Sequence, residues 1–109
     1  MALAGAELIF FPSAEFDPTG DIIEAYLRSR SSENCLFVAF ANRIGSEGKT
    51  NFFGRSQIIS PYHGVLSRAA RGGVAVTELD FATLNSARRK LPYLNERLPK
   101  AYSGLVANS

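Results

Sequence analysis

The chain has 109 residues, of which 46% are hydrophobic and 20% charged, and its formal net charge is +2. This balance predicts one globular domain with a modest core and argues against a disordered chain. The small net charge, with one short basic run at residues 88–90, argues against a nucleic-acid partner.

Cysteine usage and the first residues bear on the cellular compartment. The chain has 1 cysteine, so no internal disulfide can form and a cytoplasmic location is expected. The opening residues 1–13 are too short and too interrupted to span a bilayer. They also lack the cationic segment of a signal peptide, so we expect no membrane partner.

The first predicted strand is the apolar run at residues 6–12. Because this run is continuous rather than alternating, it predicts a strand that is buried on both faces. Residues 13–21 predict a loop, and a helix is expected to follow to about residue 33. One face of this helix is expected to carry Ile22, Ile23, Tyr26 and Leu27.

The middle of the chain predicts a region rich in strands. Residues 35–41 form a second apolar run and predict another buried strand. Residues 42–50 are polar, contain glycines and predict a turn. Two further strands are expected at residues 51–60 and 65–70, joined by a hairpin turn at 61–64.

The last part of the chain predicts one strand, one helix and a tail. After a turn at residues 71–73, the alternating residues 74–80 predict a strand. Asp80 is expected to cap a helix, which Pro92 ends because proline forces the preceding residue out of helical space. Residues 92–109 have no clean period and are expected to form an extended tail that packs across a surface or a partner.

These elements give the order β-α-β-β-β-β-α-tail in a single domain, residues 1–109. The expected class is α/β, or α+β in some schemes. Two helices cannot cover both faces of a five-stranded sheet, so one apolar face is expected to need a cover. The chain is therefore interpreted as half of a layered structure.

Two residue types that often carry chemistry occur once each. Cys35 follows a predicted helix C-terminus, where the dipole disfavours a thiolate, and a buried structural residue in the second strand is expected. His63 lies in the predicted hairpin turn and is expected to be exposed. One cysteine and one histidine cannot form an ordinary zinc site, so neither a metal nor a cofactor is expected.

The carboxylates offer one candidate position. Asp17 precedes a proline, so turn chemistry accounts for it. Glu15 follows the end of the first strand, and the loops after such strand ends carry the sites of α/β sheets. The candidate pocket-lining residues are Pro12, Ser13, Ala14 and Glu15. Taken from the residues alone, the chain holds no complete catalytic set.

Four longer stretches add a family signal. They are LAGAELIFFPSA (3–14), RSRSSENCLFVAFANRIG (28–45), FFGRSQIISPYHGVLSRA (52–69) and LPYLNERLPKAY (91–102). In this order they resemble the C-terminal half of a nitrilase-superfamily carbon–nitrogen hydrolase of the amidase type. One departure is the pair Ser31 and Ser32, where the family prefers alanine and an aliphatic residue. Ser32 would weaken helix packing if it faced inward.

The resemblance implies one half of a four-layer α-β-β-α sandwich. It also implies hydrolysis of small non-peptide amides or nitriles by a Glu base, a Lys and a Cys nucleophile. All three lie before the point where this chain starts, and Cys35 falls at a variable, non-catalytic position. The chain alone is therefore expected to have no catalytic residue and no activity.

The resemblance also implies partners. The first is the missing N-terminal half or a homologous chain, and a homo-oligomer is expected through the sheet face, the helices and the tail. The alternative is a non-catalytic remnant that associates with a full-length homologue. A nucleic-acid-binding module is a third hypothesis, and it rests only on the basic pI and residues 88–90.

Overall fold

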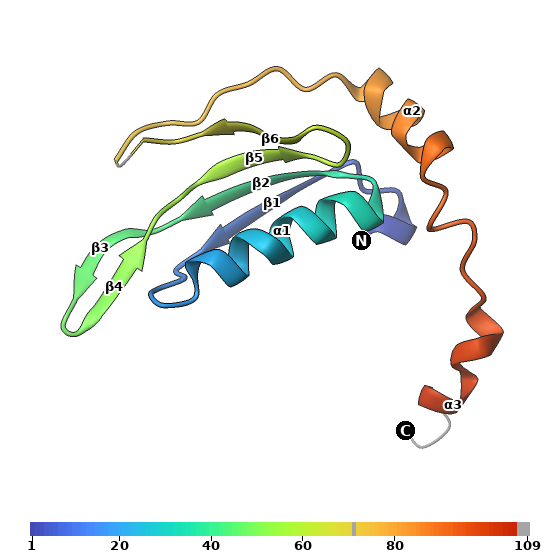
Figure 1. The fold of residues 1–109 in the computed structure, drawn as a ribbon, viewed down its shortest axis with the longest axis horizontal. Helices are drawn as coiled ribbons and strands as arrows, with labels where there is room; N and C mark the ends of the chain where they lie inside the picture. Colours follow the sequence, from blue (N-terminus) through green and yellow to red (C-terminus); the bar gives the residue numbers. More distant parts are fainter. Residues whose placement is uncertain (71, 107–109) are drawn as a thin grey trace.

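The computed structural model describes residues 1–70 and 72–106. A four-stranded sheet in the order β1-β2-β5-β6 forms the body, and the two-stranded β3–β4 hairpin extends from one end of it (Figure 1). The strands are β1 (Leu8–Ser13), β2 (Phe37–Asn42), β3 (Ile44–Glu47), β4 (Thr50–Phe53), β5 (Gln57–Ser60) and β6 (Gly64–Arg68). The helices are α1 (Gly20–Asn34), α2 (Phe81–Lys90) and α3 (Ser103–Val106), with the short 3-10 turns η1 (Ala2–Ala4) and η2 (Pro99–Tyr102).

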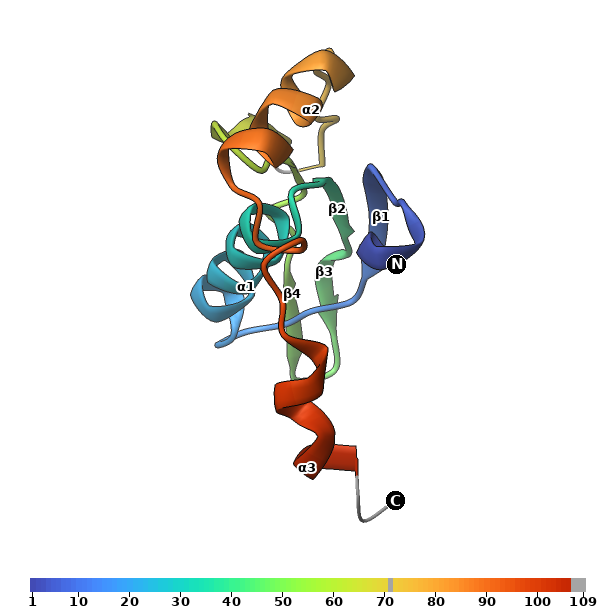
Figure 2. The same cartoon turned by 90° about the vertical axis from the view of Figure 1, so that its right-hand side faces the viewer.

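Helix α1 connects the one parallel strand pair and covers one face of the sheet. β1 and β2 are parallel, whereas β2–β5 and β5–β6 are antiparallel. Leu27 of α1 packs with Val38 and Phe40 of β2 and with Ile59 of β5 to form the core. Figure 2 shows α1 on one side of the strands. The expected order of α1 and its flanking strands is confirmed.

Helix α1 buries fewer residues than expected. Leu27 is buried and Ile23 packs against the core, but Ile22 and Tyr26 are exposed, Tyr26 to 60%. Ser31 is the buried serine of the Ser31–Ser32 pair, and its Oγ donates to the Leu36 carbonyl oxygen at 2.7 Å. This bond satisfies the hydroxyl, so the departure from the family pattern leaves no unpaired group in the core.

The β-rich middle differs from the prediction. Residues 42–50 were expected to be a turn, but they contribute β3 and the start of β4. The expected strand at 51–60 is divided into β4 and β5, because Gly54 and Arg55 both have positive φ angles, 69° and 57°, which end an extended strand. Residues 74–80 are not assigned as a strand.

Helix α2 agrees with the prediction. The Asp80 side chain accepts a hydrogen bond from the Ala82 amide at 2.8 Å and caps the helix. Arg88 in its last turn donates to the carbonyl oxygens of Cys35 at 3.2 Å and Ala6 at 2.9 Å. These bonds hold α2 against the end of α1 and the start of β1. After α2 the chain leaves the body as an arm, residues 91–106, which ends in α3 (Figure 1).

Strand β1 contradicts one expectation. It was expected to be buried on both faces, but it is an edge strand, and Phe10 on one face and Phe11 on the other are 75% and 41% exposed. The molecule is thin, with extents of 47 × 40 × 19 Å. Its accessible surface is 7481 Å², whereas a compact protein of this mass exposes about 5,900 Å². The described residues thus form one sheet layer and one helix layer.

The helices show no membrane segment. Within residues 1–70 and 72–106, none is both long enough and apolar enough to cross a bilayer.

Candidate functional site

The candidate site lies where the parallel strands β1 and β2 end. Ser13 is the last residue of β1 and pairs in register with Asn42, the last residue of β2. The loop that leads to α1 begins directly after Ser13. This edge is where open α/β sheets place their ligands.

Asn42 binds the loop through its side chain. Its Oδ1 accepts a hydrogen bond from the Glu15 amide at 2.7 Å, and its Nδ2 donates to the Glu15 carbonyl oxygen at 3.0 Å. The Asn42 residue is only 9% exposed. Ser56 holds Asn42 in turn, because its Oγ accepts from the Asn42 amide at 2.9 Å and donates to the Asn42 carbonyl oxygen at 3.3 Å. The loop, β2 and the chain before β5 are thereby joined.

The β3–β4 hairpin holds the same loop from the other side. The Asp17 amide donates to the Asn51 carbonyl oxygen at 3.0 Å. The Asn51 side chain also donates to the Asp17 carboxylate. The rings of Phe16 and Phe52 meet edge to face, with centroids 6.3 Å apart. The loop is therefore held at Glu15 by β2 and at Phe16 and Asp17 by the hairpin.

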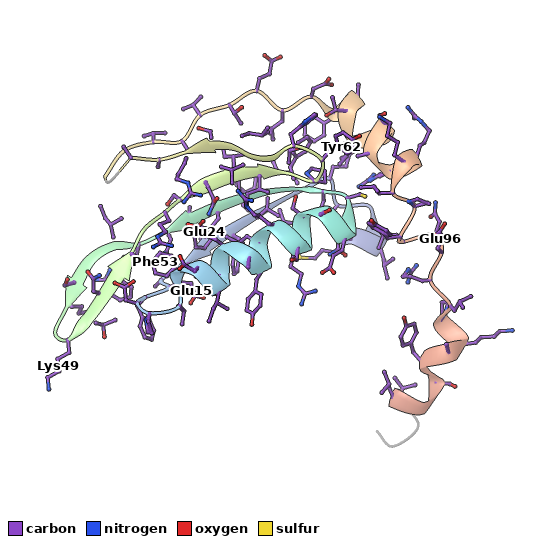
Figure 3. All side chains as sticks on the ribbon, in the orientation of Figure 1. Glu15, Glu24, Lys49, Phe53, Tyr62 and Glu96 are labelled. Carbon is purple, nitrogen blue, oxygen red and sulfur yellow. The ribbon has the colours of Figure 1, made fainter. Side chains whose placement is uncertain are left out.

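The four predicted pocket residues do not share one environment. Ser13 and Glu15 are half-buried and lie together, with the Ser13 hydroxyl donating to the Glu15 carboxylate at 3.4 Å. Pro12 and Ala14 are exposed. Figure 3 shows Glu15 in the loop before α1. A cavity of about 630 Å³ near this loop is lined by residues such as Asn42, Asn51 and Ser56, and residues 12–15 are not part of its lining. A pocket-lining role for Pro12, Ser13, Ala14 and Glu15 therefore stays a prediction.

An ionic cluster lies beside this cavity. The Glu24 carboxylate accepts two hydrogen bonds from Arg68, at 2.7 and 3.1 Å. The Arg68 hydrogen bond holds the pKa of Glu24 below its usual value, although burial opposes this shift. Glu24 lies between α1 and the sheet (Figure 3), and its side chain is 19% exposed. A carboxylate so bound stays ionised at neutral pH, so Glu24 ties α1 to β6 and is no proton donor.

Arg55 extends the cluster. Its Nη1 lies 2.7 Å from Asp21 Oδ1 and 3.5 Å from Glu24 Oε1. The hydrogen bond to Asp21 raises the pKa of Arg55, and that to Glu24 raises the pKa of Arg68. Both guanidiniums line the cavity, but each already has a carboxylate partner. The cluster therefore offers no uncompensated charge for a ligand.

The environment of the single cysteine does not suit a nucleophile. Cys35 is 2% exposed, and burial raises the pKa of its thiol. The sequence predicted that Cys35 would lie in the second strand. In the structure it lies just before that strand and caps the C-terminus of α1, with a φ of 47°. Its Sγ lies 3.4 Å from the Leu91 carbonyl oxygen. The buried structural role is confirmed, and its place in the fold is corrected.

The only histidine lies on the surface, as the sequence predicted. His63 is exposed in the turn before β6, with its ring centroid 5.2 Å from that of Tyr62. Among residues 1–70 and 72–106, no group of three or more His, Cys, Asp or Glu side chains could hold a metal ion.

Sequence reasoning missed the two residues that organise the site, Asn42 and Ser56. Asn42 was placed in a polar turn and Ser56 in a strand, and although both lie in stretches that resemble the family, neither was named as a site residue. The available signal was the position of Asn42, since a polar residue directly after a buried apolar strand falls at the same sheet edge as Glu15. Nothing in the sequence indicated that its amide would bind Glu15, which lies 27 residues earlier.

A parallel strand pair with a crossover helix and an organised loop at its carboxyl edge defines an α/β scaffold of the kind that carries enzyme sites. The family model for carbon-nitrogen hydrolase matches residues 1–89. The chain belongs to the carbon–nitrogen hydrolase family.

Three relatives illustrate the likeness. The hydrolase in the pqqF 5′ region of Pseudomonas protegens is 35% identical over 109 residues, which cover 96% of this chain and 37% of that protein. The (R)-stereoselective amidase of a Pseudomonas species is 35% identical over 99 residues, 89% of this chain and 36% of the relative. The crystal structure of the C. elegans NitFhit protein superposes with a TM-score of 0.87 at 28% identity, over 94% of this chain and 26% of that one.

The α/β fold expected from the sequence is confirmed by this structural likeness. The chain spans about 37% of the length of the first of these relatives. These matches do not confirm that this share is the C-terminal half of the family domain, and that expectation stays a prediction.

Proposed function

We propose that this chain is part of a carbon–nitrogen hydrolase that acts on small non-peptide amides or nitriles, and that another polypeptide segment supplies the Glu-Lys-Cys set. The observation that carries the proposal is the match of residues 1–89 to the family while the only cysteine is buried, with a raised thiol pKa. An acyl-thioester mechanism needs an accessible thiolate. The chain alone is therefore inactive.

In this proposal, the chain contributes residues that line one side of the substrate pocket. Asn42 and the β3–β4 hairpin hold the loop that carries Glu15 at the carboxyl edge of β1. In the assembled enzyme, residues 12–15 would line the pocket beside the nucleophile. The four stretches that resemble the family in order, starting with the strand at 3–14, support placement in the C-terminal half.

The test is complementation in two arms. The chain is co-expressed with either the N-terminal or the C-terminal portion of a related amidase, and ammonia release from small aliphatic amides is measured. We expect activity only with the N-terminal portion. Activity with neither portion would contradict the proposed function. Activity with only the C-terminal portion would contradict the placement but keep the family chemistry.

A matched pair of cysteine variants identifies the nucleophile in the active complex. Cys35→Ser in this chain is expected to keep most of the activity, because Cys35 is buried away from the sheet edge. Replacing the nucleophile candidate in the added portion by serine is expected to abolish it. Loss of activity in the first variant at unchanged stability would overturn the assignment.

A second candidate function is a non-catalytic partner of a full-length homologue. The exposed apolar residues of β1 favour it, because monomeric proteins rarely leave such an edge uncovered. Co-purification of this chain with a full-length homologue, with no gain in hydrolysis, is the expected result. Separate elution of the two chains would remove this candidate.

We also infer a cytoplasmic location, supported by the free thiol of the only cysteine. A nucleic-acid role has no support beyond composition, since Arg88 is already bound to the carbonyl oxygens of Cys35 and Ala6.

A further inference from the structure

The segment from the end of β1 to the first turn of α1 carries negative charge only. Residues 13–21 contain Glu15, Asp17 and Asp21, and no lysine, arginine or histidine. Asp21 forms an ion pair with Arg55, and the Asp17 carboxylate accepts a hydrogen bond from the Asn51 side chain. The third carboxylate, that of Glu15, has a different environment.

The Glu15 carboxylate has no cationic partner within the described part of the chain. The ion pairs found there do not include it. The Ser13 hydroxyl donates to its Oε1 at 3.4 Å, which is long for such a bond, and Oε2 accepts no hydrogen bond from the described residues. Arg43, Arg55 and Arg68 are each bound to another carboxylate, at 2.6 or 2.7 Å. The charge of Glu15 is therefore uncompensated by these residues.

The main chain fixes the position of this charge. Asn42 accepts a hydrogen bond from the Glu15 amide at 2.7 Å and donates to the Glu15 carbonyl oxygen at 3.0 Å. Asn42 is itself buried and bound to Ser56. The Glu15 side chain is half-buried beside Ser13, at the carboxyl edge of the parallel strands. Open α/β sheets bind their ligands at this edge.

A fixed, half-buried carboxylate without a partner favours a cationic ligand. A hydrogen bond from an ammonium group to a carboxylate is shorter and about twice as strong as one between neutral groups. Partial exclusion of water strengthens this attraction, and it strengthens the repulsion of an anion in the same way. A ligand with an apolar end would bury the carboxylate without a donor, which is unfavourable. Such a site discriminates between ligands by their charge.

We propose that Glu15 selects amide substrates that carry a protonated amine at the end remote from the reacting amide group. The ammonium group donates to the Glu15 carboxylate, and Ser13 holds that carboxylate through Oε1. As a substrate preference, this inference rests on the proposed function, and it names the substrate class.

The test compares three amides of similar length in the active complex of this chain with the added amidase portion. They are γ-aminobutyramide, with an ammonium end, valeramide, with a methyl end, and succinamate, with a carboxylate end. At neutral pH and low ionic strength we expect kcat/KM to be at least about tenfold higher for γ-aminobutyramide than for valeramide. Succinamate is expected to be the poorest substrate.

Variants of Glu15 separate its effect from that of the added portion. Glu15→Gln is expected to lower the ratio of kcat/KM for γ-aminobutyramide to that for valeramide about tenfold. Glu15→Lys is expected to reverse the preference in favour of succinamate. Both variants should fold, with unchanged far-UV circular dichroism, because Asn42 binds only the main chain of Glu15.

The matched control is Glu96→Gln, which also removes one negative charge. Glu96 is exposed on the arm, and Figure 3 shows it away from Glu15. This variant is expected to keep the ratio of the unaltered complex. A ratio that Glu15→Gln leaves unchanged, or that both variants lower equally, would overturn the role of Glu15 and leave the hydrolase proposal in place.

A binding measurement distinguishes failure of the inference from failure of the proposed function. Absence of activity in both complementation arms contradicts the proposed function, and recognition is then decided by NMR titration of the 109-residue chain. A shift of the Glu15 amide resonance that γ-aminobutyramide causes, and valeramide does not, supports the cation site. Equal responses to the two amides, or no response to either, overturn it.

Discussion

At the scale of single residues, the site depends on side chains that bind backbone. The Asn42 amide both donates to and accepts from Glu15, as a neighbouring strand would do. Arg88 uses its guanidinium on two carbonyl oxygens and is 4.0 Å from the nearest Glu7 carboxylate oxygen. Each of these side chains fixes the course of a distant segment.

Asn42→Ala is expected to lower the free energy of unfolding by about 1–3 kcal/mol, because it leaves the half-buried amide and carbonyl of Glu15 unpaired. Urea denaturation measures this change, and hydrogen exchange at the Glu15 amide should speed up. The control is Asn85→Ala, at an exposed position of α2, for which we expect a change within about 0.5 kcal/mol. Equal losses in the two variants would contradict a special role for Asn42.

The Cys35 thiol is expected to resist labelling. Burial raises its pKa and excludes reagent, so a thiol-specific reagent at neutral pH should react only as fast as the protein opens. Addition of urea should make the reaction rapid. Ser46→Cys provides an exposed thiol on β3 as an internal reference that reacts at once. Equal labelling rates at the two positions in the native protein would show that Cys35 is accessible.

At the scale of elements, α1 is joined to the sheet side of the molecule by apolar packing and by ion pairs. Leu27 fills the core, while Glu24 reaches Arg68 on β6. Within the β3–β4 hairpin region, Ile44 packs so close to Gly54 that a Cβ at Gly54 would lie 2.5 Å from Ile44 Cγ2. Both connections can be altered singly.

Glu24→Gln is expected to make the free energy of unfolding less dependent on pH below about pH 4.5. The Arg68 hydrogen bond lowers the folded-state pKa of Glu24 below the ordinary 4.5. Its contribution to stability is therefore complete above pH 4.5 and is lost as the pH falls through the lower folded value. At pH 7 the variant should lose about 1–3 kcal/mol. Glu33→Gln, in the exposed pair with Arg30, should change little. Parallel pH profiles for the unaltered chain and Glu24→Gln would contradict this account.

Gly54→Ala is expected to destabilise the hairpin. Gly54 has a φ of 69°, and a Cβ there would lie 2.5 Å from Ile44 Cγ2. Gly48 on the same hairpin has a φ of 57° but has nothing within 4 Å of its Cβ position. Gly48→Ala therefore shows the backbone cost alone, about 1–2 kcal/mol, and Gly54→Ala should exceed it. Thermal unfolding measures both, and equal losses would mean that Ile44 moves aside freely.

At the scale of the whole molecule, the α/β fold class and the ends of the helices could be predicted from the sequence. Asp80 caps α2, and α1 ends within a residue of the expected position, because capping and helix breaking are local effects. The hairpin could not be predicted, since the polar residues 42–50 resemble a turn and their pairing depends on Phe52 and Phe53. The site depended on contacts between residues 27 apart, which spacing alone does not reveal.

The exposure of β1 is also a property of the whole molecule. Its apolar run correctly predicted a strand, and the expectation of cover on both faces was wrong for a single chain. Burial of an edge strand is decided by what lies beside it. The sequence of the strand therefore describes the assembled state better than the isolated chain.

The contacts of Arg88 bear on where the chain could begin and end without a change of fold. They bring residues 6 and 88, 82 positions apart, within one side chain of each other, so the polypeptide from β1 to α2 forms a nearly closed ring. A circular permutant that links the end of α2 to the start of β1 through a few residues, and opens the ring at the Lys49 tip of the hairpin, would keep every strand pairing of the main sheet. The arm could then be removed or attached elsewhere without changing the connectivity of the body.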